Sequence, residues 1–387
     1  MNDEEIESPD ERTTRLSDTR TTMPFTVRMR RSPFFERSHA AGAQTYLVYN
    51  HMLLACDFDS AEEDYRHLKR AVQLWDVGCE RQVEITGPDA ARLVQMSTPR
   101  DISAMQDDQC FYIPTVDQQG NMTNDPVLLR VAPERYWVSI ADSDLLLFYK
   151  GLAAGSKLDV TIREPDVAPL GIQGPRATEL VTRVWGEEAA NIRFFRHRRV
   201  DVAGKPMILA RSGYSLQGGF ELYFEGTEGG DRLWDQLMEA GHDLDVRAGS
   251  PCQAERIESG LLSYLSDITP DMTPLEAGLD RFCSLDRDVG CIAYSELRKK
   301  REPSRQVRPI EIDGSRVPPM TDFWTITDGS GNRVGRVSSS AWSFDHGCNV
   351  AIGLVDKSRW NPATEVVVEA PDGPRRAVVR QEFWGRE

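Results

Sequence analysis

The sequence predicts an α+β protein made of two pseudo-repeated α+β subdomains and a small β-barrel at the carboxyl end. The first observation is an internal repeat, in which Ile172–Val181 matches Ile85–Val94 at 6 of 10 positions, 87 residues apart. That period is too long for a solenoid unit and fits a duplicated subdomain. The second is the segment after residue 298, where short apolar runs alternate with Gly, Pro and Asp, as in small closed all-β modules.

Composition divides the chain into three parts. Residues 1–24 are acidic and contain too few large apolar side chains to offset the entropy of ordering, so they are predicted to be a disordered tail. Residues 25–298 then hold the two interleaved α+β subdomains. Arg298–Pro303 is predicted to be a polar linker, and 299–387 is assigned to the barrel.

The individual elements follow from local patterns. Ser60–Glu63 is a capping-box signature, and it predicts a helix with a buried face of Leu68, Ala71, Val72 and Trp75. Gly-Pro in each repeat copy, with Pro at the first helical position, predicts a strand, a turn and a helix. Strands are predicted at Gln82–Ile85, Tyr136–Ala141, Pro206–Ala210, Phe220–Phe224, Val307–Ile312, Trp324–Thr327, Val334–Val337, Asn349–Val355, Thr364–Glu369 and Ala377–Gln381.

Charge and hydropathy exclude several classes of function. The chain has 46 Lys and Arg against 61 Asp and Glu, a net charge of −15, so we expect no nucleic-acid partner. No apolar run approaches the roughly 18 residues of a membrane span, and the amino terminus does not resemble a signal peptide. We therefore expect a cytoplasmic protein without a membrane partner. The 7 scattered cysteines form no CxxC pair and are predicted to be reduced.

Motifs for phosphate, metal and dinucleotide chemistry are absent from the sequence. There is no GxxxxGK[ST] loop, no GxGxxG after a strand and no HExxH. The 6 histidines never reach metal-ligand spacing with one another or with a cysteine. We therefore expect neither a metal nor a flavin.

One predicted strand carries two polar side chains on a single face. Its core face is Phe220, Leu222 and Phe224, which places Glu221 and Tyr223 together on the other face. A carboxylate beside a phenol, just after a Gly-Gly turn, suits a flat, donor-rich heterocycle. The residues alone nevertheless favour the alternative, a solvated strand face without a ligand.

Two further groups of residues are candidates for a binding site. Asp125 follows a glycine turn and precedes a proline, downstream of Tyr112; a simple strand-entry turn is the alternative. Arg256 lies in a predicted helix, Glu255–Gly260, where it could clamp a carboxylate or pair with Glu255 or Glu258.

Taken together, these residues resemble the aminomethyltransferase family, the folate-dependent T-proteins of glycine cleavage. The family pattern is matched by Asp125, Gly218–Glu221, Glu255–Gly260 and Thr273–Leu279. A narrower resemblance, over about residues 25–387, is to the branch of the family that demethylates dimethylsulfoniopropionate. It is carried by Arg28–Arg31, Tyr49–Leu54, Trp75–Gln82, Asp107–Asp117, Leu158–Val160, Glu164–Val167 and Val350–Asp356.

The resemblance implies a three-domain ring around a folate channel and a tetrahydrofolate-dependent demethylase. Tetrahydrofolate would accept a methyl group from dimethylsulfoniopropionate or a related sulfonium, giving 5-methyltetrahydrofolate and the thioether methylmercaptopropionate. By position, Tyr112 and Asp125 would be the catalytic pair near N5, and Asp125 would also bind folate. Glu221 and Tyr223 would hold the pterin, and Arg256 the folate tail. Tyr112, Tyr214 and Tyr223 would contact the donor.

The same segments leave the methyl donor and the partners open. The branch pattern has Trp and Lys where this chain has Tyr214 and Leu216. Tyrosine still attracts a sulfonium by cation–π interaction, more weakly than tryptophan, and the missing lysine removes one partner for a donor carboxylate. Open alternatives are demethylation of a betaine or methoxy donor, a glycine-cleavage aminomethyltransferase acting with a lipoyl carrier, and a non-catalytic folate-binding protein. A homodimer is a further open expectation.

Overall fold

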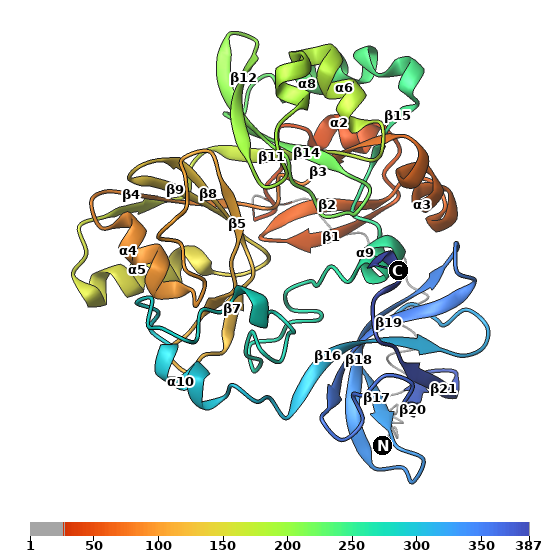
Figure 1. Ribbon diagram of the computed structural model, residues 1–387. Coiled ribbons are helices and arrows are strands. Elements are labelled where there is room, and N and C mark those ends of the chain that lie inside the picture. Colours follow the sequence, from red (N-terminus) through yellow and green to blue (C-terminus); the bar gives the residue numbers. More distant parts are fainter. Residues whose placement is uncertain (1–25, 27, 387) are drawn as a thin grey trace, which may run out of the picture.

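The computed structural model describes residue 26 and residues 28–386, which form two α/β layers and a β-barrel (Figure 1). In sequence order, the first strand of one layer is followed by the strands of the other layer, then by the remaining strands of the first layer, and last by those of the barrel. The predicted α+β class with a carboxyl-terminal barrel is confirmed. The predicted disordered tail, 1–24, lies outside the described residues. No helix in the described part of the chain is long and apolar enough to cross a membrane.

The first layer is a six-stranded sheet in the order β12-β13-β14-β11-β3-β15, antiparallel except for the β15–β3 pair. Its strands are β3 (Val72–Asp76), β11 (Val167–Gln173), β12 (His197–Val202), β13 (Lys205–Ala210), β14 (Gly219–Glu225) and β15 (Val246–Gly249). The helices near it are α2 (Phe35–Ala40), α3 (Ala61–Arg70), α6 (Ala177–Trp185), α7 (Glu187–Ala190), α8 (Gly230–Ala240) and η1 (His242–Leu244). Phe220, Leu222 and Phe224 bury the core face of β14 against α6 and α8, as predicted.

The second layer is a five-stranded sheet in the order β10-β4-β9-β8-β5. Its strands are β4 (Gln82–Thr86), β5 (Cys110–Tyr112), β8 (Val127–Ala132), β9 (Arg135–Ser139) and β10 (Thr161–Arg163). The two helices α4 (Ala90–Ser97) and α5 (Leu145–Ser156) cover one face through Leu93, Val94, Leu145 and Tyr149. The opposite face packs on the six-stranded sheet, where Cys110, Leu129 and Trp137 meet Ile208, Ala210 and Tyr223.

The sequence repeat corresponds to two equivalent strand–helix turns, one in each sheet. The first copy is β4 followed by α4, and the second is β11 followed by α6. Their glycines have nearly identical backbones, with φ +124° at Gly87 and +122° at Gly174. A Cβ on Gly174 would lie 2.3 Å from the Ala71 carbonyl oxygen, so both the conformation and the close approach require glycine.

Replacing Gly174 with alanine is therefore expected to destabilise the fold by about 3 kcal/mol or more, because strain at positive φ adds to a clash with backbone. Gly151→Ala is the matched control, since Gly151 lies within α5 with open space at its Cβ position. The control should be neutral or slightly stabilising. Chemical denaturation of the two variants measures the difference, and equal stability would contradict this account of the turn.

The helix predicted from Ser60 forms, but it is shorter than expected. Ser60 Oγ accepts from the Glu63 amide at 3.1 Å, and α3 ends at Arg70. The prediction that Val72 and Trp75 continue its buried face is wrong. Ala71 leaves the helical conformation, its carbonyl accepts from the Arg176 amide in the repeated turn, and the next residues form β3. Pairing of β3 with β11 and β15 overrides the helical spacing of the apolar residues.

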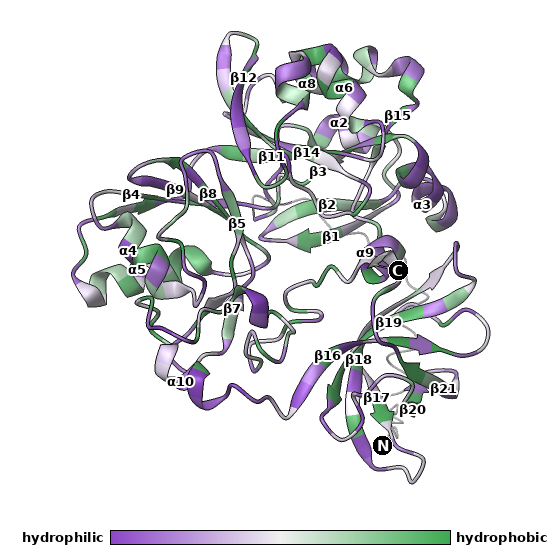
Figure 2. Ribbon diagram, in the orientation of Figure 1, coloured by the Kyte–Doolittle hydropathy of each residue, from purple (hydrophilic) through white to green (hydrophobic). Residues whose placement is uncertain are grey.

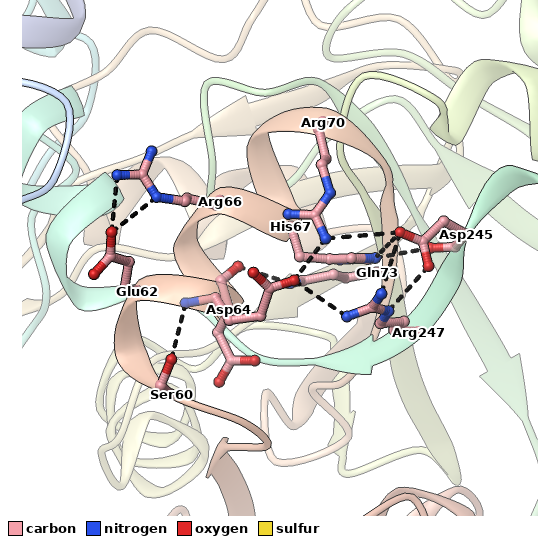
Figure 3. Close-up of polar contacts among 10 residues, drawn as sticks. Ser60, Glu62, Asp64, Arg66, His67, Arg70, Gln73, Asp245 and Arg247 are labelled. Carbon is pink, nitrogen blue, oxygen red and sulfur yellow. Dashed lines mark hydrogen bonds and ion pairs between the residues drawn. The ribbon is translucent and has the colours of Figure 1, made fainter.

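Ion pairs tie α3, a markedly hydrophilic helix (Figure 2), to the start of β15 (Figure 3). His67 and Arg70 point toward Asp245, with the His67 Nε2 donating to the Asp245 carbonyl at 2.8 Å. Arg247 also pairs with Asp245, at 3.0 Å. Burial lowers the pKa of His67, so the neutral ring is favoured.

The barrel is closed in the order β16-β19-β18-β17-β20-β21. Its strands are β16 (Arg305–Ile312), β17 (Trp324–Thr327), β18 (Arg333–Ser343), β19 (Cys348–Asp356), β20 (Glu365–Ala370) and β21 (Gly373–Val379). All six predicted strands are present, but β18 is longer than predicted, and β21 begins four residues before and ends two residues before the predicted Ala377–Gln381. The remaining elements are two two-stranded sheets, β1 (Thr45–Tyr49) with β2 (Met52–Asp57) and β6 (Thr115–Val116) with β7 (Met122–Asn124), and the helices α9 (Gln253–Ser259), η2 (Asp280–Phe282), α10 (Tyr294–Lys299) and η3 (Trp384–Arg386). Arg298 and Lys299 thus complete a helix rather than begin the polar linker.

Candidate active site

A cavity of about 1330 Å³ lies where the two sheets, α9 and the barrel meet. Its wall takes residues from the β1–β2 hairpin, from both sheets, from the loop after α9, from η2 and from the first barrel strand. Most sequence-predicted site residues line it: Tyr112, Asp125, Tyr214, Glu221 and Arg256. Side chains that are far apart in the sequence therefore converge on one space.

Because side chains alternate between the two faces of β14, Glu221 lies on the face that lines this cavity. The side chain is 7% exposed, and the Ser212 hydroxyl donates to Oε2. Burial raises the pKa of Glu221, although the hydrogen bond from Ser212 acts in the opposite direction. The prediction that Glu221 and Tyr223 share the face of β14 opposite its core face is confirmed, and the alternative of a solvated face is wrong because both side chains are buried.

Tyr223 itself does not reach the cavity wall. Its ring is 1% exposed and packs in the core between the two sheets, with its centroid 6.1 Å from that of Trp137. Its hydroxyl is directed at Glu221 and Ser139. The structure therefore places Tyr223 where it supports Glu221, and not where it would touch a ligand.

Asp125 and Tyr112 form a hydrogen-bonded pair in the cavity wall. The Tyr112 hydroxyl donates to Asp125 Oδ2 at 2.9 Å, and the Tyr112 ring packs edge-on against Phe282 with centroids 5.2 Å apart. Burial raises the pKa of Asp125 to about 7, while the Tyr112 hydrogen bond lowers it. A carboxyl group with this pKa can exchange a proton near neutral pH.

Two wall residues were not assigned a role from the sequence. Glu80 lies in the turn after β3, and burial raises its pKa well above the ordinary range, with contributions from the charges of Glu221 and Asp125. Tyr49 lines the same region and interacts electrostatically with Glu80, Asp125 and Tyr214. Glu80, Asp125 and Glu221 thus lie close enough to interact electrostatically, and this part of the cavity favours ligands that are cationic or rich in N–H donors. Two further carboxyl groups, those of Asp280 and Glu382, also line the cavity. A glutamate in a turn between two strands gives no local signal of burial.

Tyr214 and Arg256 are held by protein contacts at the edge of the cavity. The Tyr214 hydroxyl donates to the carbonyls of Leu261 and Leu262, at 3.1 and 2.8 Å. The Arg256 Nη1 lies 2.7 Å from Asp267 Oδ2, and Nη2 donates to Ser339 Oγ of β18 at 2.6 Å. Neither Glu255 nor Glu258, the partners considered from the sequence, forms the ion pair. Arg256 therefore connects α9 both to Asp267 and to barrel strand β18.

No group of three His, Cys, Asp or Glu side chains that could hold a metal ion occurs in residues 26 and 28–386.

Comparison with known proteins matches almost the whole chain. The GCVT N-terminal domain matches residues 34–287, and the glycine cleavage T-protein C-terminal barrel domain matches residues 305–383. A dimethylsulfoniopropionate demethylase DmdA from Ruegeria pomeroyi is 52% identical over 358 residues, covering 92% of this chain and 98% of the relative. An aminomethyltransferase from Desulfitobacterium hafniense (strain Y51) is 27% identical, covering 84% and 90%.

A solved structure has the same fold. The crystal structure of the glycine cleavage system aminomethyltransferase T from Bartonella henselae superposes with a TM-score of 0.80, at 21% sequence identity, over 92% of this chain and 98% of that one. Both family domains, in this order, and the shared architecture lead to one conclusion. The chain belongs to the glycine cleavage T-protein family.

Proposed function

We propose that this protein is a tetrahydrofolate-dependent demethylase that transfers a methyl group from dimethylsulfoniopropionate to tetrahydrofolate. The observation that carries the proposal is the 52% identity, over 98% of its length, to a protein named as a demethylase of that compound. The cavity supports it independently, because its carboxyl groups and tyrosines suit a pterin and a sulfonium. We also propose residues 25–298 as the folate-binding region and 299–387 as the barrel domain.

On the folate side, Glu221 would accept hydrogen bonds from the amino edge of the pterin. Its carboxylate is buried and fixed by Ser212, so the contact would be charge-assisted and need little reorganisation. Asp125 would lie near N5, positioned by Tyr112. Tetrahydrofolate would supply N5 as the nucleophile for the methyl carbon.

On the donor side, the rings of Tyr112 and Tyr214 would hold the sulfonium by cation–π attraction. In the transfer, the N5–methyl bond forms as the sulfur–methyl bond breaks, and sulfur leaves with the bonding electrons as a neutral thioether. The N5 proton is then released, and the ionised Asp125 is the group in the wall suited to accept it. Because the leaving group is neutral, positioning supplies most of the acceleration.

A donor panel tests this function. Purified protein is incubated with tetrahydrofolate and, separately, with dimethylsulfoniopropionate, glycine betaine or a methoxyaromatic, and 5-methyltetrahydrofolate is measured by mass spectrometry. Product is expected with dimethylsulfoniopropionate alone. Product only with another donor would keep the demethylase and replace its substrate. Tetrahydrofolate binding without product from any donor would favour a non-catalytic folate-binding protein and contradict the proposal.

A further inference from the structure

Six arginines line the cavity, and within the part of the chain that the structure describes four of them form no ion pair: Arg100, Arg211, Arg281 and Arg308. Arg211 lies apart from the other three, because it donates to the Ala190 carbonyl at 3.1 Å and stacks on Phe220 of β14. Arg196 and Arg256 line the same cavity, but they pair with Asp108 and Asp267. Asp280 and Glu382 also line the cavity, but neither forms an ion pair with Arg100, Arg281 or Arg308 in the described residues. Three guanidinium groups without an ion pair in the wall of one cavity, in a chain of net charge −15, favour an anionic ligand.

Two of these guanidinium groups converge on one ring. The Arg281 and Arg100 guanidinium carbons lie 4.6 and 5.0 Å from the centroid of Phe282. Arg100 is anchored by donating to the Tyr112 carbonyl at 2.7 Å, and the charge of Arg281 contributes, after burial, to lowering the pKa of Arg100. Two cations held this close together repel each other, so binding of an anion between them would relieve the repulsion.

Arg308 completes the cluster from the barrel side. It stacks on Trp360 at 4.9 Å and donates to the carbonyls of Trp360 and Val307, at 3.2 and 3.0 Å. Asp280, the residue before Arg281, acts on Arg308 electrostatically without forming an ion pair. Arg281 belongs to η2, Arg100 contacts Phe282 of η2, and Arg308 is close enough to Asp280 of η2 to interact electrostatically. The three arginines therefore meet at η2.

We propose that Arg100, Arg281 and Arg308 form an anion site that binds the glutamate carboxylates of the folate tail. This inference rests on the proposed function. It places the tail away from Arg256, whose donors are already engaged by Asp267, Ser339 and Gln253. Arginine matches a carboxylate with two parallel hydrogen bonds, and several arginines would accommodate a chain of more than one glutamate.

The order of groups along the wall matches the order of groups along folate. The Asp125–Tyr112 pair comes first, the Phe282 ring packs on Tyr112, and the two guanidinium groups lie over Phe282. Folate presents a pterin, an aromatic aminobenzoyl ring and then glutamate. The cavity volume of about 1330 Å³ also exceeds the roughly 300–1,000 Å³ of most small-molecule sites, which leaves room for a tail.

Arg281→Ala is the variant of choice, because Arg281 is exposed and its only described contact is with Phe282. Arg298→Ala is the matched control: Arg298 is also exposed and stacked on a ring, that of Tyr294 at 5.7 Å, but it lies outside the cavity wall. Arg308→Ala is less suitable, since Arg308 also holds the Trp360 loop of the barrel.

Isothermal titration of wild type and both variants uses three probes: tetrahydrofolate, its triglutamate, and 6-methyltetrahydropterin, which has no tail. We expect Arg281→Ala to weaken binding of tetrahydrofolate about tenfold and of the triglutamate more. Binding of the tail-less pterin should be unchanged, as should every affinity of Arg298→Ala. Wild-type affinity for both folates in Arg281→Ala would overturn the proposal and leave the proposed function standing.

The donor also carries a carboxylate, so the same variant is assayed for its KM with dimethylsulfoniopropionate. A raised donor KM with unchanged folate affinity would assign the cluster to the donor and overturn the assignment to the tail. If wild-type protein binds neither folate, the proposed function itself fails, and the tail site fails with it.

Discussion

Glu221→Gln is expected to weaken tetrahydrofolate binding about 10- to 100-fold. The substitution keeps the size of a side chain that is 7% exposed, but it removes the charge that strengthens hydrogen bonds to the pterin. It also replaces one acceptor oxygen by an amide donor, which would face the donors of the pterin edge. Titration calorimetry with tetrahydrofolate measures the loss directly.

Glu225→Gln is the control for this variant. Glu225 ends the same strand, is half-exposed, and lies outside the cavity wall. It should bind tetrahydrofolate like wild type. If Glu221→Gln and Glu225→Gln both retain wild-type affinity, the pterin does not bind at Glu221 and the orientation of folate proposed here is wrong.

Asp125→Asn is expected to lower kcat for methyl transfer about 100-fold, because the variant cannot accept the N5 proton. In wild type, the pKa of Asp125 near 7 predicts that kcat rises with pH through neutrality as the carboxyl group ionises. The variant should lose this rise. A pH–rate profile of each protein measures both effects, and an Asp125→Asn enzyme with wild-type kcat and profile would contradict the role.

Tyr112→Phe gives a companion test that keeps the carboxyl group. Removing the Tyr112 hydroxyl removes a hydrogen bond that lowers the pKa of Asp125, so the rise in kcat should move to higher pH.

The Asp125→Asn variant is expected to fold, so a low kcat would report on catalysis rather than on loss of structure. The folded-state pKa of about 7 exceeds the ordinary 3.8, so Asp125 costs stability as pH rises from about 4 to about 7. Above pH 7, Asp125→Asn should unfold at a temperature equal to or higher than that of wild type.

Much of the fold could be predicted because its signals are local. The Gly-Pro turns of the repeat, the alternation of β14 and the short strands of the barrel each depend on residues that are neighbours in the sequence. The end of α3 could not be predicted in the same way. Ala71 leaves the helix where the turn of Gly174, about a hundred residues later, packs against its carbonyl.

Site residues that belong to a local sequence pattern could be predicted, whereas residues whose position depends on tertiary packing were missed. Alternation placed Glu221 and Tyr223 on one face, but packing of the second sheet against that face buried Tyr223 beside Trp137 and left Glu221 at the cavity. Glu80 lies in the turn after β3, and Asp267, the partner of Arg256, lies 11 residues further along the chain in the loop after α9. Neither leaves a periodic pattern.

The central claim is that the methyl group moves from the sulfonium to folate within this cavity. Dimethylsulfoniopropionate with deuterated S-methyl groups, incubated with the purified protein and tetrahydrofolate, tests it most directly. The account predicts 5-methyltetrahydrofolate that carries the full deuterated methyl group, together with an equal amount of methylmercaptopropionate. Unlabelled 5-methyltetrahydrofolate, or consumption of the donor without a labelled folate, would contradict it.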